Sequence, residues 1–419
     1  MQRMKDSGIE WIGKIPADWN IVRIGTQYTE RKSKVSDTEY PPLSVTMKGI
    51  VPQLATAAKT DAHDDRKLVC KGDFAINSRS DRRGSCGISA YDGSVSLINT
   101  ILCPRDEMNP EYYDWLFHST MFSDEFYKWG HGIVDDLWTT NWQDMKRISI
   151  PEPSLEEQAK IAEHLTKVCA EIDAVIEKTK ATIEEYKKLK QSVITEAVTK
   201  GIRSNRAMKN SGNLWYGEIP SDWDIRKLKY MFRIKKDIAG KEGYTVLSIT
   251  QRGIMPKNIA SNEGQIAENY SNYQLVEPGD FAMNHMDLLT GWVDISKYHG
   301  VTSPDYRVFV LLDMENNHSQ YYLYLMQMCY TNRIFYGLGQ GVSGMGRWRL
   351  QADKFLNFTI PVPSYEEQKE IAEYLDKKCA EIDTLIAKKT ALLAEMESYK
   401  KSVIYEYVTG KKEVNDING

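Results

Sequence analysis

Residues 339–344 read Gly-Gln-Gly-Val-Ser-Gly and have the glycine spacing of a loop that binds a dinucleotide phosphate. Such a loop works where a strand precedes it, a helix follows it and an acidic side chain lies further on. The flanking residues, 333–336 and 345–348, do not clearly supply these elements. The first half of the chain has only Gly-His-Gly at residues 130–132 in the corresponding place. We therefore interpret the motif as a loop that both halves share.

Asn109-Pro110-Glu111-Tyr112 approximates the Asn-Pro-Pro-Tyr motif that aligns the target amino group in adenine methyltransferases. That chemistry also needs a glycine-rich loop for the methyl donor, and none lies upstream. The second half has Asn-His-Ser-Gln-Tyr at residues 317–321 in this place. A helix start is the better interpretation, and no catalytic residue is expected in this chain.

Composition restricts the remaining kinds of site. The six cysteines occur singly, without a Cys-x-x-Cys pair, so neither a zinc site nor a redox motif is indicated and no metal is expected. No apolar run is long enough for a membrane span, and the N-terminus lacks a signal-peptide core, so a reducing cytoplasm fits best. The net charge of −4 means that any nucleic-acid binding must be local. A length of 419 residues suits two domains.

The elements that would position any site are duplicated. An opening motif, Gly-x-Ile-Pro-x-x-Trp, occurs at Gly13–Trp19 and again, 204 residues later, at Gly217–Trp223. A helix-start motif, Ile-Pro-x-Pro-Ser-x-Glu-Glu-Gln, occurs at Ile150–Gln158 and again, 210 residues later, at Ile360–Gln368. A period close to half the chain indicates a duplicated domain rather than a solenoid unit.

Each half ends in one long helical pattern. Ser154 and Glu157 have the spacing of a capping box. Apolar residues then recur at steps of three and four, and no proline or glycine follows until Gly201. A helix of this length would be roughly 70 Å long. The same pattern follows Ser364, and two equal apolar stripes predict an intramolecular helix pair, antiparallel or parallel. The alternative is that each helix packs on its own globular part.

The two globular parts share short motifs, but the segments between these motifs differ. Gly-Asp-Phe-Ala occurs at residues 72–75 and 279–282. Short β-rich runs separated by glycine and proline, with helix signals near residues 112–117 and 321–326, predict an α+β fold. By contrast, residues 78–83 read Ser-Arg-Ser-Asp-Arg-Arg, whereas the corresponding residues 285–290 read His-Met-Asp-Leu-Leu-Thr. Unlike loops on one framework are where recognition is usually placed.

We therefore expect five segments. The first module is residues 1–153 and the second module is residues 201–363. A central long helix, residues 154–200, separates them in the sequence. A C-terminal long helix, residues 364–411, and a flexible tail, residues 412–419, complete the chain.

Together these repeats resemble the specificity subunit of type I restriction–modification systems. The resemblance rests on the opening motif, the Gly-Asp-Phe core and the helix-start motif, and it covers nearly the whole chain. Each motif alone is short and weak. Their duplication in the same order makes the resemblance strong.

The resemblance implies a fold and a mechanism. Two target-recognition domains would be separated by two long antiparallel helices, with pseudo-twofold symmetry, and each domain would read one half of a split, asymmetric DNA site. The helices would set the gap and dock two modification (methyltransferase) subunits, and restriction subunits would join that core. The chain itself would be non-catalytic; S-adenosylmethionine, Mg²⁺ and ATP are expected only on the partner subunits. The helices show no short internal repeat of the kind that changes spacing in some members, so the gap length cannot be read.

On this interpretation, loop residues with suitable side chains are candidates for contact with double-stranded DNA. Arg and Lys suit guanine, Asn and Gln suit adenine, and Asp suits cytosine, while basic and hydroxyl side chains also suit phosphates. The Arg79–Arg83 cluster and the Arg347/Arg349 pair stand out because each lies in a loop beside a repeated segment. Trp138, Trp142 and Trp348 could stack on bases, but core packing is favoured. The candidates are Lys48, Arg79, Arg82, Arg83, His131 and Asn141 in the first module, and Gln251, Arg252, His285, Asp287, Arg347 and Arg349 in the second.

Two other functions fit parts of the pattern. One is a two-headed scaffold that binds proteins through its coiled coil and never contacts DNA. The other is a fused methyltransferase, which the missing methyl-donor loop disfavours.

Overall fold

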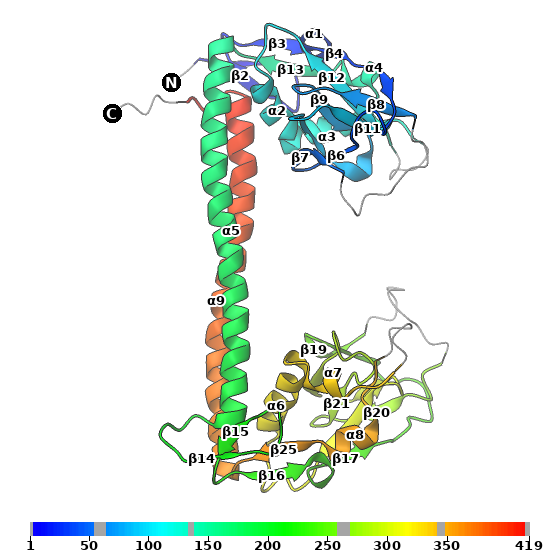
Figure 1. Cartoon of the computed structure of the whole chain (residues 1–419), viewed down its shortest axis with the longest axis vertical. Coiled ribbons are helices and arrows are strands. Elements are labelled where there is room, and N and C mark those ends of the chain that lie inside the picture. The colour runs from blue at the N-terminus through cyan, green and yellow to red at the C-terminus, as the bar shows by residue number, and fades with distance from the viewer. Residues whose placement is uncertain (1–2, 54–63, 133–137, 258–268, 342–347, 415–419) are drawn as a thin grey trace. The chain divides into compact units, whose positions relative to one another are not determined.

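The computed structural model describes residues 3–53, 64–132, 138–257, 269–341 and 348–414. The chain forms two compact units (Figure 1). Unit 1 comprises residues 1–180 and 390–419, and unit 2 comprises residues 181–389. Both boundaries fall inside the long helices α5 (Leu155–Lys200) and α9 (Tyr365–Val408). Each unit therefore holds one module, the start of one long helix and the end of the other.

A four-stranded antiparallel sheet lies at the centre of each module. Its strand order is β10-β9-β12-β4 in the first module and β22-β21-β24-β17 in the second. The registers also match, because Ala75 pairs with Ile101 where Ala282 pairs with Val308. The duplication thus extends to topology. The strands are β4 (Tyr28–Glu30), β9 (Phe74–Asn77), β10 (Cys86–Ile88) and β12 (Asn99–Pro104), then β17 (Phe232–Lys235), β21 (Phe281–Met283), β22 (Val293–Ile295) and β24 (Arg307–Leu311).

Smaller sheets and short helices surround the central sheet of each module. In the first module the strands are β1 (Met4–Asp6), β2 (Lys14–Pro16), β3 (Asn20–Arg23), β5 (Lys34–Val35), β6 (Leu43–Thr46), β7 (Gly49–Pro52), β8 (Arg66–Val69), β11 (Gly93–Ser96) and β13 (Ser149–Glu152). Its helices are α1 (Ile24–Gln27), the 3₁₀ turn η1 (Ser80–Arg82), α2 (Pro110–His118), α3 (Thr120–Lys128) and α4 (Trp142–Met145).

The second module repeats four outer strand pairs of the first: β1–β2, β3–β13, β6–β7 and β8–β11 correspond to β14–β15, β16–β25, β18–β19 and β20–β23. Its outer strands are β14 (Met208–Asn210), β15 (Glu218–Pro220), β16 (Asp224–Lys227), β18 (Leu247–Thr250), β19 (Gly253–Pro256), β20 (Gln274–Val276), β23 (Gly300–Thr302) and β25 (Thr359–Val362). Its helices are η3 (Leu228–Tyr230), α6 (Ser319–Thr331), α7 (Ile334–Leu338) and α8 (Ala352–Asn357). The α+β fold class expected from the sequence is confirmed in both modules. No helix in the described part of the chain is long and apolar enough to cross a membrane.

The repeated Gly-Asp-Phe motif has a structural role. Gly72 adopts a φ of +91°, which side chains of L-residues rarely tolerate. The buried Asp73 carboxylate accepts hydrogen bonds from the Arg31 guanidinium at 2.6 and 2.9 Å, and Asp280 accepts one from Lys235 at 2.7 Å. A buried carboxylate needs such a partner, so each motif fixes the start of a central strand to a neighbouring strand.

The opening motif and the helix-start motif meet in each unit. The indole of Trp19 donates a hydrogen bond to Glu157 at 2.8 Å, and that of Trp223 donates to Glu367 at 3.1 Å. The Ser154 hydroxyl accepts from the Glu157 amide at 3.2 Å, as a capping box requires. The capping-box expectation is thus half right, because the Glu157 carboxylate binds the tryptophan instead of completing the box.

The Asn-Pro motif is a helix start, as the sequence favoured. The side chain of Asn109 accepts a hydrogen bond from the Tyr112 amide at 2.9 Å and caps α2. The amide of Asn109 donates to Gln158 at 2.9 Å, and the amide of His318 donates to Gln368 at 2.8 Å. The final glutamine of the helix-start motif therefore joins α5 to the start of α2 and α9 to the start of α6.

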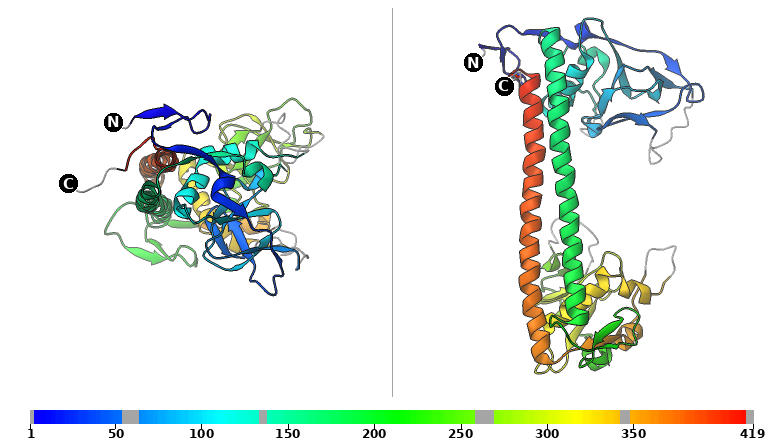
Figure 2. Two further views of the ribbon diagram at one scale, coloured as in Figure 1. Left: turned by 90° about the horizontal axis from the view of Figure 1, so that it is seen from above. Right: turned by 60° about the vertical axis from the view of Figure 1, so that its left-hand side comes forward.

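Within each unit the two long helices run antiparallel. The end of α9 lies along the start of α5 in unit 1, and the end of α5 lies along the start of α9 in unit 2 (Figures 1 and 2). Asp173 pairs with Lys400 at 2.6 Å, and Asp383 pairs with Lys190 at 2.6 Å. Both partners are displaced by 210 residues, so the same interhelical contact occurs twice with the roles of the helices exchanged.

The long helices also join the module cores. Ile161 and Leu165 of α5 share a hydrophobic core with Tyr407 of α9 and the aromatic residues of the first module. The Tyr112 hydroxyl donates to the Val408 carbonyl at 2.8 Å, and the matching Tyr321 hydroxyl donates to that of Val198 at 3.2 Å. Each helix thus packs both on its partner helix and on a module.

Candidate nucleic-acid interface

Backbone pairing gathers three separate segments of the first module. Arg79 and His131 both pair with Thr139, with the His131 and Thr139 amides and carbonyls 3.1 Å apart in each direction. The Ser80 amide donates to the Trp138 carbonyl at 2.9 Å. We call residues 78–83, 131 and 138–141 the first loop cluster. It contains five of the six candidates in this module.

The arginines of the first loop cluster are held by weak ion pairs. Asp81 lies 3.2 Å from the Arg79 guanidinium and 3.7 Å from that of Arg82. Arg83 pairs with Asp124 at 2.9 Å and lies over the Tyr127 ring. The side chains of Arg82 and Arg83 are 68% and 59% exposed. Exposed pairs of this kind contribute little stability, so a phosphate could replace the aspartates.

Two candidates in the first module have other surroundings. The Asn141 side chain accepts hydrogen bonds from the amides of Gln143 at 2.7 Å and Asp144 at 3.3 Å, so it caps α4. Lys48 is exposed in the turn between β6 and β7. It lines a groove with Asp173 of α5 rather than the first loop cluster.

The second loop cluster comprises residues 251–252, 285–290 and 349–350. Asp287 accepts hydrogen bonds from the Leu289 amide at 3.0 Å and the Thr290 amide at 2.9 Å. Burial opposes ionisation of Asp287, but the hydrogen bonds from Thr290 and its neighbours lower the pKa of this carboxyl. Gln251 donates to the Thr290 carbonyl at 3.4 Å, whereas Arg252 is exposed in the β18–β19 turn. The Asp287 carboxylate therefore closes a turn.

His285 and Arg349 come from two segments of this cluster that a backbone hydrogen bond joins. The Leu350 amide donates to the His285 carbonyl at 3.0 Å, and Arg349 forms a backbone pair with Gln340 at 2.9 and 3.1 Å. Burial, then the charges of Arg307 and Arg349, lower the pKa of His285 to about 4, so its imidazole is neutral at pH 7. Arg347 lies outside the described residues.

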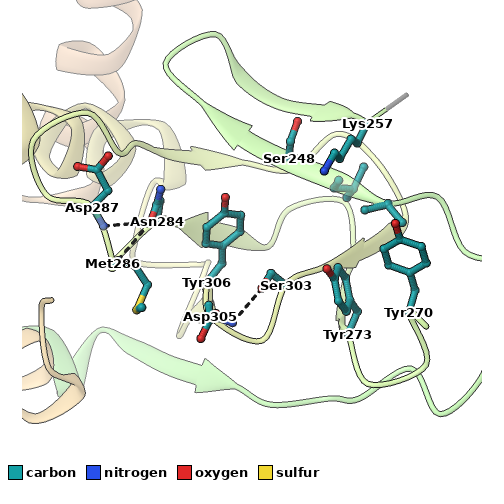
Figure 3. Close-up of a pocket in the computed structure, with 12 residues that line it drawn as sticks. Ser248, Lys257, Tyr270, Tyr273, Asn284, Met286, Asp287, Ser303, Asp305 and Tyr306 are labelled. Atoms are coloured by element: carbon teal, nitrogen blue, oxygen red, sulfur yellow. Dashed lines mark hydrogen bonds between the residues drawn. The ribbon is translucent and has the colours of Figure 1, made fainter. Parts of the chain in front are cut away.

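A cavity of about 530 Å³ adjoins the second loop cluster (Figure 3). The rings of Tyr270, Tyr273 and Tyr306 line it together with Asn284 and Asp287. Burial raises the pKa of Tyr273 and Tyr306, so these phenols are uncharged. Neutral aromatic rings can stack on unpaired bases of any sequence.

The tryptophans mainly pack in the modules. Trp142 and Trp348 contact the two hydrophobic cores, and the Trp348 indole donates to the Tyr336 carbonyl at 2.7 Å. Trp138 is half-buried. Helix α7 precedes Gly339 where a dinucleotide loop would have a strand. The described residues contain no group of three or more His, Cys, Asp or Glu side chains placed to hold a metal ion.

The two modules share one topology but have different loops. Comparison with known proteins explains this combination. The model of the type I restriction modification DNA specificity domain matches residues 18–185 and 220–395. The chain belongs to this family. It is the DNA-recognition subunit of a type I restriction–modification system, a non-catalytic subunit whose partners are DNA and the methyltransferase and restriction subunits.

Relatives of this specificity subunit match along almost their whole length. The MjaVIII specificity subunit of Methanocaldococcus jannaschii is 27% identical, over 97% of this chain and 95% of the relative. The EcoDI specificity subunit of Escherichia coli is 24% identical, over 95% of this chain and 90% of the relative.

Solved structures show the same fold. A chain from a study of complex assembly and conformational transition of the type I R-M system has a TM-score of 0.70 at 14% identity, covering 95% of this chain and 99% of its own. The HsdS subunit of Thermoanaerobacter tengcongensis has a TM-score of 0.51 at 16% identity, covering 95% and 98%.

Proposed function

We propose that each module reads one half of a split, asymmetric DNA site. The observation that carries this proposal is one framework with two unlike loop clusters. The central sheets agree in strand order and register, while the first loop cluster presents arginines where the second presents His285 and a closed Asp287 turn. Side chains on equivalent loops approach DNA from equivalent positions, so unlike side chains select unlike bases.

The helix pair would dock two modification subunits and set the gap between half-sites. The duplicated Asp–Lys contact supports this, because the same contact between the two long helices recurs in each unit. The modification subunits would supply S-adenosylmethionine and methylate adenine, and Mg²⁺ and ATP would be bound only by partner subunits, in the cytoplasm. Deleting about two heptads from both helices should then shorten the gap in the methylated motif. An unaltered gap would refute this role of the helices.

A gel-shift experiment separates DNA recognition from a protein scaffold. The chain is assembled with its matching modification subunit and mixed with a pool of random duplexes, and the retarded DNA is sequenced. A specificity subunit enriches one split motif. A scaffold retards either no DNA or all duplexes alike, and either result would overturn the proposal.

A further inference from the structure

Arg307, at the start of the central strand β24, is a buried cation. It is 6% exposed, donates hydrogen bonds to the Leu350 carbonyl at 2.8 Å and, more weakly, to the Met283 sulfur at 3.9 Å, and lies 5.0 Å from the centre of the Phe355 ring. Within the described residues, no carboxylate lies within ion-pair distance of its guanidinium. A buried charge without a counter-charge is costly and calls for an explanation.

Two further groups surround this cation. Arg349 neighbours Leu350, to which Arg307 is bonded, and is half-buried. The Nδ1 atom of His285 is buried and has no hydrogen-bond partner among the described residues. The charges of Arg307 and Arg349 both act on His285 and lower its pKa. Leu350 joins these groups, because its amide donates to the His285 carbonyl at 3.0 Å while its carbonyl accepts from Arg307. The two cations and the unsatisfied imidazole therefore gather at one part of the second loop cluster.

The matching site of the first module is neutral. The Thr140 amide donates to the Ser78 carbonyl at 3.0 Å, as the Leu350 amide does to that of His285. In the sheet, Thr100 pairs with Ile76 where Arg307 pairs with Met283. Ser78 and Thr100 join their hydroxyls at 3.1 Å. Three hydroxyl residues thus stand where the second module has His285, Arg307 and Leu350, so the framework itself does not require the cation.

We propose that Arg349 contacts a backbone phosphate of DNA at the second half-site, with Arg307 as the positioning residue beneath it. This inference rests on the proposed function. Both arginines offer only donors and positive charge, which suits a phosphate, and a bound phosphate supplies the counter-charge that Arg307 lacks. Arg307 fixes the Leu350 carbonyl and thereby the backbone that carries Arg349.

Single neutral phosphate substitutions test this contact. The complex with the modification subunit is titrated with its cognate duplex carrying one methylphosphonate at each position of the second half-site in turn. Wild type should lose roughly tenfold in affinity at one position, as expected for a lost charge-assisted hydrogen bond. Arg349→Gln should bind more weakly on unmodified DNA, show no further loss at that position, and reduce the slope of log K against log salt by about 0.9.

Variants beneath the loop separate positioning from folding. Arg307→Met should lose the same phosphate sensitivity, whereas Arg307→Lys, which keeps the charge, should retain most of it. Thr100→Val changes the matching position of the first module and should leave the profile of the second half-site unchanged. If Arg307→Met fails to fold, the Arg349→Gln result still decides the contact.

Three outcomes would overturn the inference or its basis. Full phosphate sensitivity in Arg349→Gln removes the contact. A relaxed preference at one base pair with an unchanged salt slope assigns Arg349 to a base instead. A wild-type complex that binds every duplex equally contradicts the proposed function itself, which distinguishes that failure from the other two.

Discussion

Replacing Glu367 with glutamine should loosen the start of α9 far more than Glu157→Gln loosens the start of α5, although both residues occupy one position of the repeat. Glu367 has a side chain that is 2% exposed, and it accepts from the Trp223 indole and forms an ion pair with Arg206. Glu157 is half-buried and accepts from the Trp19 indole. Among the described residues, no arginine pairs with it.

The structure sets the size of the two effects. Removing one partner of a buried ion pair costs about 3–5 kcal/mol. Arg206 keeps Asp222 at 2.7 Å, so we expect a loss below that range, about 2–3 kcal/mol, or roughly 30- to 150-fold in local opening. A glutamine at position 157 still accepts from Trp19, so Glu157→Gln should change stability by less than about 0.5 kcal/mol at neutral pH.

The pH dependence provides a second signature. Burial raises the pKa of Glu157 above its ordinary 4.5. The contribution of the Glu157 carboxyl to folding stability is therefore fully present below pH 4.5. It is lost as the pH rises through the raised pKa of the folded state. Glu157→Gln should match wild type in acid and equal or exceed it at neutral pH.

Hydrogen exchange measured by mass spectrometry resolves the two helix starts separately. Peptides from residues 365–375 should exchange roughly 30- to 150-fold faster in Glu367→Gln, while those from residues 155–165 change little in Glu157→Gln. Equal acceleration in the two variants, or a larger effect at Glu157, would refute the reasoning from the Arg206 pair.

Three other predictions follow from single contacts. Asn109→Ala should destabilise unit 1 by about 1 kcal/mol in denaturant unfolding, through loss of the α2 cap, yet leave methylation by the assembled complex unchanged; lost methylation in a folded complex would revive a catalytic role for the motif. Lys400→Asp should lower the melting temperature slightly, by no more than about 1 kcal/mol in stability, and adding Asp173→Lys should restore it; the deficit should vanish in high salt, and a deficit that persists there would contradict a surface ion pair. Because the pKa of folded His285 is about 4, only the unfolded histidine binds a proton between pH 6.5 and 4, and the second module should lose stability as the pH falls through this range. His285→Asn should flatten this dependence of stability on pH. Equal slopes in wild type and variant would exclude His285 as its origin.

The repeated part of the fold was predictable because its motifs occur twice in the sequence, in the same order. The matching motifs give matching sheets, and uninterrupted apolar steps give α5 and α9. The sequence left the direction of the helix pair open, and only the family resemblance made it antiparallel. The contact between Trp19 and Glu157 was missed because it joins residues 138 positions apart, while the capping-box spacing offered Glu157 a local partner.

The loop residues were harder to assign. Asn141 and Asp287 were chosen for side chains that read bases, but short polar side chains also bond nearby backbone amides, and both do so here. Lys48 has the right charge in a turn that faces the long helices. Arg307 was overlooked because it opens an apolar strand. The two halves of the chain place Arg307 at the position of Thr100, and this difference in charge is the signal that would have identified Arg307.

Replacing one module tests the central claim most directly. Residues 1–150 are exchanged for the equivalent module of another specificity subunit, and the methylated motif of the host genome is determined by methylation-sensitive sequencing. We predict that one half of the split motif changes while the other half and the gap stay the same. A change in both halves, or in neither while methylation continues, would contradict it.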